Sequence, residues 1–138
     1  MNIREQKKAD QKAMQKLFDT SLKHIRKQGV PSYNKRTHAC RYRAGKLSCG
    51  AAPFIVNYHK DMEGKDWVTL SSESCKFVKD LNPLSVEHSF FVSCLQRAHD
   101  SAAQALFYNN LDFLTTYEDN MSRIAEGHKL TYKKAPKK

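Results

Sequence analysis

The sequence predicts an α+β fold: one mostly α-helical domain that contains a single small β-hairpin. Three observations support this expectation. Apolar residues recur with helical spacing over residues 10–27, further stretches with this spacing fill the C-terminal half, and residues 40–49 alternate around a glycine. A chain of 138 residues can bury one core without disulfides or metal ions. We therefore expect one domain at residues 1–132 and a disordered lysine-rich tail at 133–138.

The first expected element is an amphipathic helix at about residues 10–27. Its apolar stripe consists of residues three and four positions apart, namely Met14, Leu17, Phe18, Leu22 and Ile25. The opposite face of the helix carries four lysines: Lys12, Lys16, Lys23 and Lys27. The turns before Asp10 break the stripe, so we expect them to fray. Gly29 can cap the helix in the left-handed conformation, and Pro31 prevents its continuation.

Residues 40–49 predict a β-hairpin with Ala44 and Gly45 as its two-residue turn. In that register the cross-strand pairs are 43/46, 42/47, 41/48 and 40/49. Alternation along the strands places four residues on an inner face: Cys40, Tyr42, Leu47 and Cys49. The outer face would then carry Arg41, Arg43, Lys46 and Ser48. The hairpin would thus rest on the core and present a basic face to solvent.

The expected register places Cys40 directly opposite Cys49, close enough to form a disulfide under oxidising conditions. In a reducing cytosol we expect free thiols instead. Zinc is an alternative, because His38 and His59 could complete a tetrahedral ligand set if the segment after the hairpin folds back. The spacing does not require such a site, since the sequence has no C-x-x-C pair.

The C-terminal half predicts three more helices, at residues 71–79, 85–98 and 101–126. The last is expected to break near residues 108–110 and to end at Gly127. On this division His99 and Asp100 lie at the join between the two long helices. Asp100 would then cap the final helix, with His99 favoured by the dipole of the preceding one.

The basic residues are strongly segregated along the chain. Residues 1–49 contain 13 lysines and arginines and three acidic residues, which gives +10, the net charge of the whole protein. Residues 50–132 contain seven basic and 11 acidic residues, and the four lysines of the tail restore the balance. Such polarity attracts polyanions to one face, and nucleic acid is the first candidate because bound phosphates release counterions. The alternative is a solvated basic helix that only maintains solubility.

Several classes of protein are disfavoured. The longest uncharged stretch, residues 47–58, is too short to span a bilayer and contains Gly50 and Pro53. No apolar segment of the signal-peptide type opens the sequence, so we expect a cytoplasmic protein without a membrane partner. The absence of P-loop, G-x-S-x-G and H-E-x-x-H motifs disfavours nucleotide hydrolysis and acyl transfer.

Four short motifs follow one another along the chain: C-x-Y-R…C at residues 40–49, M-E-G-K at 62–65 after Tyr58, L-Q-R-A-H-D at 95–100 and R-I-A-E-x-H at 123–128. In this order and spacing they resemble a group of small proteins encoded by tailed bacteriophages and by bacterial genomes that carry prophages. The resemblance runs from about Leu22 to Leu130 and implies a role inside the bacterial host cell, in host takeover or DNA metabolism. The first helix is more basic here than in that group, and the hairpin is shorter. An anionic partner inferred from this helix therefore need not be shared by the group.

The leading hypothesis is a DNA-binding protein. Two segments supply the expected phosphate contacts, the first helix and the outer face of the hairpin: Lys12, Lys16, Lys23, Lys27, Arg41, Arg43 and Lys46. Contacts of this kind predict weak sequence specificity and a strong dependence of affinity on salt.

Two further hypotheses stay open. In a metal-dependent nuclease or nickase, Glu63, His99 and Asp100 would hold a divalent ion that activates water, and Arg43 would steady the scissile phosphate. The structural alternatives are a solvated turn at Glu63 and a helix join at residues 99–100. In an interaction module, the basic helix would instead dock on an acidic host protein.

Overall fold

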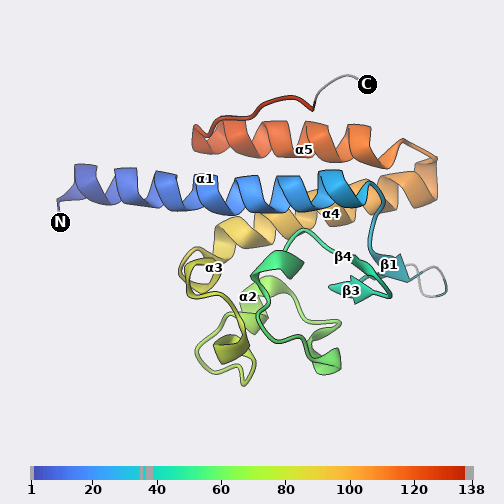
Figure 1. The fold of residues 1–138 in the computed structure, drawn as a ribbon, viewed down its shortest axis with the longest axis horizontal. Helices are drawn as coiled ribbons and strands as arrows, with labels where there is room; N and C mark the ends of the chain where they lie inside the picture. Colours follow the sequence, from blue (N-terminus) through green and yellow to red (C-terminus); the bar gives the residue numbers. More distant parts are fainter. Residues whose placement is uncertain (1, 35, 37–38, 136–138) are drawn as a thin grey trace.

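Three long helices form one side of the molecule in the computed structural model, which describes residues 2–34, 36 and 39–135. They are α1 (Ile3–Gln28), α4 (Ser89–Asn109) and α5 (Phe113–His128), and each packs against the other two. In Figure 1, α4 runs alongside α1 in the same direction, and α5 returns antiparallel to both. Their apolar stripes meet in a core that includes Phe18, Ile25, Leu95, Tyr117 and Met121. The expected mostly helical α+β fold is confirmed.

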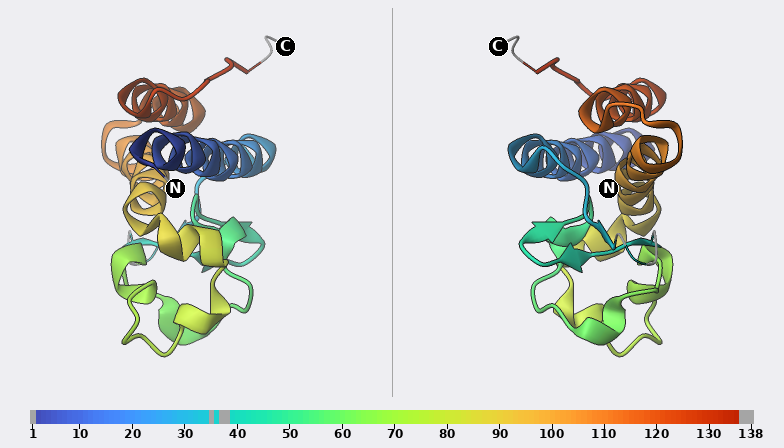
Figure 2. Two further views of the ribbon diagram at one scale, coloured as in Figure 1. Left: turned by 90° about the vertical axis from the view of Figure 1, so that its left-hand side faces the viewer. Right: turned by 90° about the vertical axis from the view of Figure 1, so that its right-hand side faces the viewer.

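Two small β-ribbons and several short helices lie on the side of α1 and α4 that faces away from α5 (Figure 2). Among the described residues, β1 (Tyr33–Asn34) pairs with β2 (Ala39–Cys40), and β3 (Arg43–Ala44) pairs with β4 (Leu47–Ser48), both antiparallel. Beyond them the chain forms 3-10 helices at Ala52–Phe54, Lys60–Met62 and Val78–Asp80, and short α-helices α2 (Trp67–Leu70) and α3 (Pro83–Glu87). Trp67 is fully buried at the centre of this irregular layer.

The expected register of the hairpin is wrong by two residues. Arg43 pairs with Ser48 and Ala44 with Leu47, so the turn consists of Gly45 and Lys46. Gly45 has φ 64°, a left-handed value that glycine adopts without strain, and it therefore takes the first turn position rather than the second. A shift of two residues preserves the faces, because side chains alternate with a period of two. Tyr42 and Cys49 are accordingly buried, and Arg43 and Lys46 are exposed, as expected.

The two cysteines of this segment do not face each other as expected. Cys40 belongs to the first ribbon, where it pairs with Tyr33, and the amide of Cys49 donates to Tyr42 O at 3.1 Å. Both cysteines are free thiols. The reason is the extra ribbon β1–β2, which the sequence did not predict and which takes Cys40 away from the second hairpin.

Helix α1 begins seven residues earlier than expected. The side chain of Asn2 accepts a hydrogen bond from the amide of Glu5 at 2.9 Å and caps the first turn. This turn is therefore helical without contacts to the core. Residues 2–9 are exposed, and in Figure 1 these first turns project beyond the other elements. At the other end Gly29 adopts φ 77° and its amide donates to Ile25 O, which confirms the predicted cap. None of the described helices is long and apolar enough to cross a lipid bilayer.

The expected division of the C-terminal half is wrong at three places, while the break expected near residues 108–110 is confirmed. His99 and Asp100 lie in the middle of α4, which continues to Asn109 and is closed by Asn110 in the left-handed conformation. Asp112, not Asp100, caps α5 by accepting the amide of Thr115 at 2.9 Å, and the helix passes through Gly127 to His128. The helix expected at residues 71–79 does not form: residues 71–77 make turns and the 3-10 helix Val78–Asp80 follows, while α2 ends before this segment.

The segment after β4 passes through a narrow gap between α1 and α4. Gly50 O accepts the hydroxyl of Ser21 in α1 at 2.7 Å. On the other side, a Cβ added at Gly50 would lie 2.8 Å from Leu95 O in α4, closer than such atoms can approach. Glycine at this position therefore allows the second ribbon to lie directly beside the C-terminal half of α1, which is the geometry on which the candidate site depends.

Replacement of Gly50 by alanine should lower the free energy of unfolding by about 1–3 kcal/mol, because the backbone of α4 must move to admit the methyl group. The matched control is Gly127→Ala in α5, where nothing lies within 4 Å of the added Cβ. That variant should raise the free energy of unfolding by about 0.5–1 kcal/mol, since alanine favours a helix interior. Urea unfolding of both variants measures the difference, and equal stability of the two would contradict the close approach at Gly50.

Candidate nucleic-acid interface

The four lysines predicted on α1 are all exposed to solvent. Lys12, Lys16, Lys23 and Lys27 lie on the side of the helix opposite its buried stripe, as the sequence pattern indicates. Within the described part of the chain none of them forms an ion pair. The positive charge of this face is therefore available to a partner.

The arginines behave differently from these lysines. Arg26, on the flank of the same face, donates from Nε and Nη2 to the two oxygens of Glu118 at 2.7 and 2.5 Å, and also to Lys133 O. Arg41, an expected phosphate contact, is half-buried, with Nε 3.9 Å from Oε2 of Glu63. Carboxylates from beyond the basic segment 1–49 thus pair with two guanidinium groups, while the lysines stay in solvent.

A cleft of about 470 Å³ lies between the C-terminal half of α1 and the second ribbon, and we call it the cationic cleft. Three of the predicted contacts converge on it: Lys23 and Lys27 from α1, and Arg43 from β3. The remaining lining residues are neutral side chains, namely Thr20, His24, Tyr42, Ser48, Ala52, Pro53, Ile55 and Tyr58. Among the described residues that line the cleft, none is acidic.

Lys12 and Lys16 lie on a second, more open depression that we call the Lys12 groove. It is formed by α1 and by residues 129–131, and it also contains Lys8, Lys129 and one acidic residue, Asp19. Residues 129–133 run along α1 because Gln11 donates to Lys129 O at 2.6 Å and Gln15 exchanges two hydrogen bonds with Thr131. Thr20 lines both the cationic cleft and the Lys12 groove, so the two adjoin. Lys46 is exposed in the turn of the second ribbon and lines neither.

Two residues of the cationic cleft were missed by sequence reasoning. His24 follows Lys23 and lies one helical turn from Lys27, so the helical spacing contained the signal for it. Its Nε2 is 3.2 Å from Ser48 O and 2.9 Å from Ser48 Oγ, and burial lowers the pKa of its imidazole. At neutral pH His24 is therefore an uncharged link between α1 and β4. Tyr58 follows a segment without clear periodicity, and the sequence gives no signal for its position.

Glu63, predicted as a catalytic carboxylate or as a solvated turn residue, is not solvated. Its side chain is only 14% exposed. Oε1 accepts the amide of Tyr42 at 2.9 Å, and Oε2 accepts the amide of Arg43 at 3.1 Å and the hydroxyl of Tyr58 at 2.5 Å. Gly64 has φ 80°, as a turn at M-E-G-K requires. Glu63 therefore fixes β3 to the segment that carries Tyr58, and these bonds occupy both of its oxygens.

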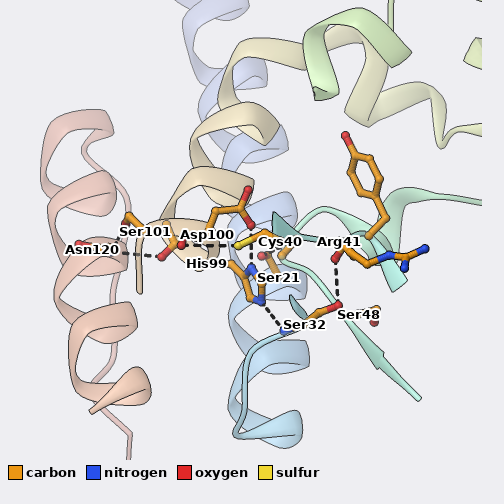
Figure 3. A network of polar contacts seen from close by, with 12 residues as sticks. Ser21, Ser32, Cys40, Arg41, Ser48, His99, Asp100, Ser101 and Asn120 are labelled. Atoms are coloured by element: carbon orange, nitrogen blue, oxygen red, sulfur yellow. Dashed lines mark hydrogen bonds and ion pairs between the residues drawn. The ribbon is translucent and has the colours of Figure 1, made fainter. Parts of the chain in front are cut away.

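His99 is fully buried and links α4 to the connection after α1 (Figure 3). The amide of Ser32 donates to its Nε2 at 2.9 Å, and its Nδ1 lies 2.8 Å from Oδ1 of Asp100. Because a backbone amide can only donate, Nε2 must carry the lone pair and Nδ1 the proton. His99 is therefore neutral and donates to Asp100. Ser32 continues the network, since its hydroxyl donates to Arg41 O at 2.9 Å.

One group of possible metal ligands occurs in the described residues: Cys40, His99 and Asp100, whose donor atoms lie within 4.8 Å of one another. Glu63 is not a member of this group, so the three expected nuclease ligands do not come together. The donor set does not fit a divalent ion. A metal on Nδ1 of His99 would require an imidazolate, because Nε2 already accepts from Ser32. Burial raises the pKa of the Cys40 thiol to about 12, so a metal would also have to displace the proton of this thiol.

The alternative zinc set is not assembled by the residues that the structure describes. Cys49 is buried in the core, and Nε2 of His59 lies 3.1 Å from a carboxylate oxygen of Asp80. His38, the fourth expected ligand, lies outside the described residues.

Replacing Glu63 by glutamine should lower the free energy of unfolding by about 1–3 kcal/mol, because an amide NH₂ cannot accept the donors that surround the carboxylate. The control is Glu73→Gln, an exposed position where little change is expected. Thermal unfolding of both variants tests this structural role. Chelator-sensitive plasmid nicking by the wild type that disappears in Glu63→Gln, with stability unchanged, would instead assign the carboxylate to catalysis.

Comparison of the chain with known proteins adds no assignment to this geometry. No protein-family model matches the sequence, and no curated protein and no solved structure shows significant similarity to it.

Proposed function

We propose that the protein binds nucleic acid, with DNA as the first candidate, through the exposed lysines of α1 and the arginine of the second ribbon. The observation that supports this proposal is the convergence of Lys23, Lys27 and Arg43 on one cleft whose described lining contains no carboxylate. A phosphate held there would contact cations from two separate elements, and each contact would release a counterion.

A basic helix that only maintains solubility explains these observations less well. Such a helix needs no second element beside it, whereas here the ribbon adds a guanidinium group to the field of the two lysines. The ion pairs of Arg26 and Arg41 also leave a face in which lysines predominate. Lysine binds phosphate as a point charge, so we expect contacts to the nucleic-acid backbone with little reading of base sequence.

The expected setting is the bacterial cytoplasm, where the resemblance to phage and prophage proteins implies host takeover or DNA metabolism. Binding to the DNA backbone would serve host takeover and DNA metabolism alike. An acidic host protein would contact the same lysines, and the binding experiment below distinguishes such a partner from DNA.

The measurement that tests the proposal is the equilibrium affinity for duplex and single-stranded DNA across a salt series. Affinity should fall steeply with salt, and Lys23→Ala combined with Lys27→Ala should make the logarithmic slope shallower by about two units. The control is Arg97→Ala combined with Arg123→Ala, which removes the same charge from exposed positions on α4 and α5. That pair should leave the slope nearly unchanged.

Two results would count against nucleic-acid binding. The first is no detectable affinity for either form of DNA at low salt. The second is an equal loss of affinity in the control pair, which would indicate attraction by net charge alone rather than by this face. Capture of an acidic protein from nuclease-treated lysate, without affinity for DNA, would favour the docking hypothesis.

A further inference from the structure

We propose that the cationic cleft receives an unpaired nucleotide, so that the preferred ligand is single-stranded nucleic acid. This inference rests on the proposed function and narrows it, because it states which form of nucleic acid the site accepts. It is carried by the shape of the cleft, by the chemistry of its lining and by one stacked pair of side chains.

The lining of the cleft is amphipathic in the way that a nucleotide is. Ala52, Pro53 and Ile55 supply an apolar surface, while Lys23 and Lys27 place positive charge on the α1 side. An unpaired nucleotide presents a flat, weakly polar base together with a phosphate, and it matches both parts. A duplex presents phosphates on a convex surface and keeps its bases stacked inside, so none of its bases would contact the apolar part of the cleft.

Arg43 and Tyr58 together form one wall of the cleft. The guanidinium carbon of Arg43 lies 4.5 Å from the centroid of the Tyr58 ring. Both residues also line an adjoining depression that contains Lys76 and Lys79, so the pair separates two spaces. Nucleic-acid bases stack on tyrosine rings and on guanidinium planes alike, with little preference for sequence.

This wall is held in place before any ligand arrives. Glu63 accepts the hydroxyl of Tyr58 at 2.5 Å and the backbone amide of Arg43 at 3.1 Å, so one half-buried carboxylate fixes the ring of Tyr58 beside the backbone that carries Arg43. Side chains that are already ordered lose less conformational entropy when a ligand binds. The role of Glu63 in the structure thus becomes the positioning of the stacking pair.

The surface beyond the cleft favours a strand over a free nucleotide. The cleft adjoins the Lys12 groove, because Thr20 lines both. Lys16 and Lys12 then follow one another along α1 at a spacing of one helical turn. A strand whose base stacks on the wall could therefore continue its phosphates along these lysines.

The test compares an oligothymidylate with a duplex of the same length, by fluorescence anisotropy at a single salt concentration. The wild type should bind the single strand more tightly. Tyr58→Leu should weaken binding of the single strand by at least about five-fold, the lower end of the effect of losing one stacked base, while affinity for the duplex changes little. Tyr58→Phe keeps the ring but loses the bond to Glu63, so it should weaken binding of the single strand less than Tyr58→Leu does.

Two further variants separate stacking from charge. Arg43→Lys keeps the positive charge but loses the planar group, so it should weaken the single-stranded complex more than the duplex complex. Lys12→Ala lies outside the cleft and should weaken both complexes to a similar extent.

Because Tyr58→Leu removes a hydrogen bond to Glu63, photo-crosslinking of an iodouracil-substituted strand to the wild-type protein provides a test without mutation, with adducts expected on residues of the cleft.

The outcomes distinguish this inference from the function on which it rests. Equal or tighter binding of the duplex, with no effect of Tyr58→Leu and with crosslinks outside the cleft, would overturn the inference and leave nucleic-acid binding intact. Thymidine monophosphate that binds as tightly as the strand would overturn the assignment to a strand. Loss of all binding at low salt would overturn both.

Discussion

The position of the second ribbon beside α1 depends on two anchors at the ends of the segment that contains it. At the first, Ser32 donates to the buried imidazole of His99; at the second, Gly50 passes between Ser21 and Leu95 with no room for a side chain. Both anchors fix the segment to α4, against which α1 also packs. Arg43 therefore faces Lys23 and Lys27 because of buried contacts, and the charged residues themselves contribute little to bringing the two elements together.

The same arrangement explains why two arginines form ion pairs while the lysines of α1 do not. Arg26 and Arg41 are half-buried, where a planar guanidinium can meet a carboxylate in a fixed geometry, and each pairs with an acidic residue from beyond residue 49. The lysines of α1 have flexible stems and more strongly hydrated ammonium groups, and they stay in solvent. The segregation of charge along the sequence is thus partly cancelled inside the fold, and what remains on the surface is concentrated on α1 and at Arg43.

Local patterns in the sequence predicted much of α1, including its buried stripe and the cap at Gly29, because both depend on neighbours within one or two turns. They also placed Tyr42 inward and Arg43 outward, and this placement is correct although the predicted register is not. They failed at His99, whose partner Ser32 is 67 residues away, and at Glu63, whose bonds reach back to Tyr42 and Arg43. A histidine or glutamate that satisfies distant backbone amides has the same local sequence as one that performs catalysis, so only tertiary structure separates the two.

The path of residues 129–133 along α1 has a consequence for the order of events during synthesis. Gln11 and Gln15 contact residues 118 and 116 positions later in the chain, and α5 covers part of the apolar stripe of α1. The first helix therefore leaves the ribosome long before its packing partners are synthesised, and its apolar stripe stays exposed to solvent until they are. Repulsion between the dense positive charges of that helix would disfavour association of nascent chains during this interval, so the lysines proposed to bind nucleic acid would also assist folding.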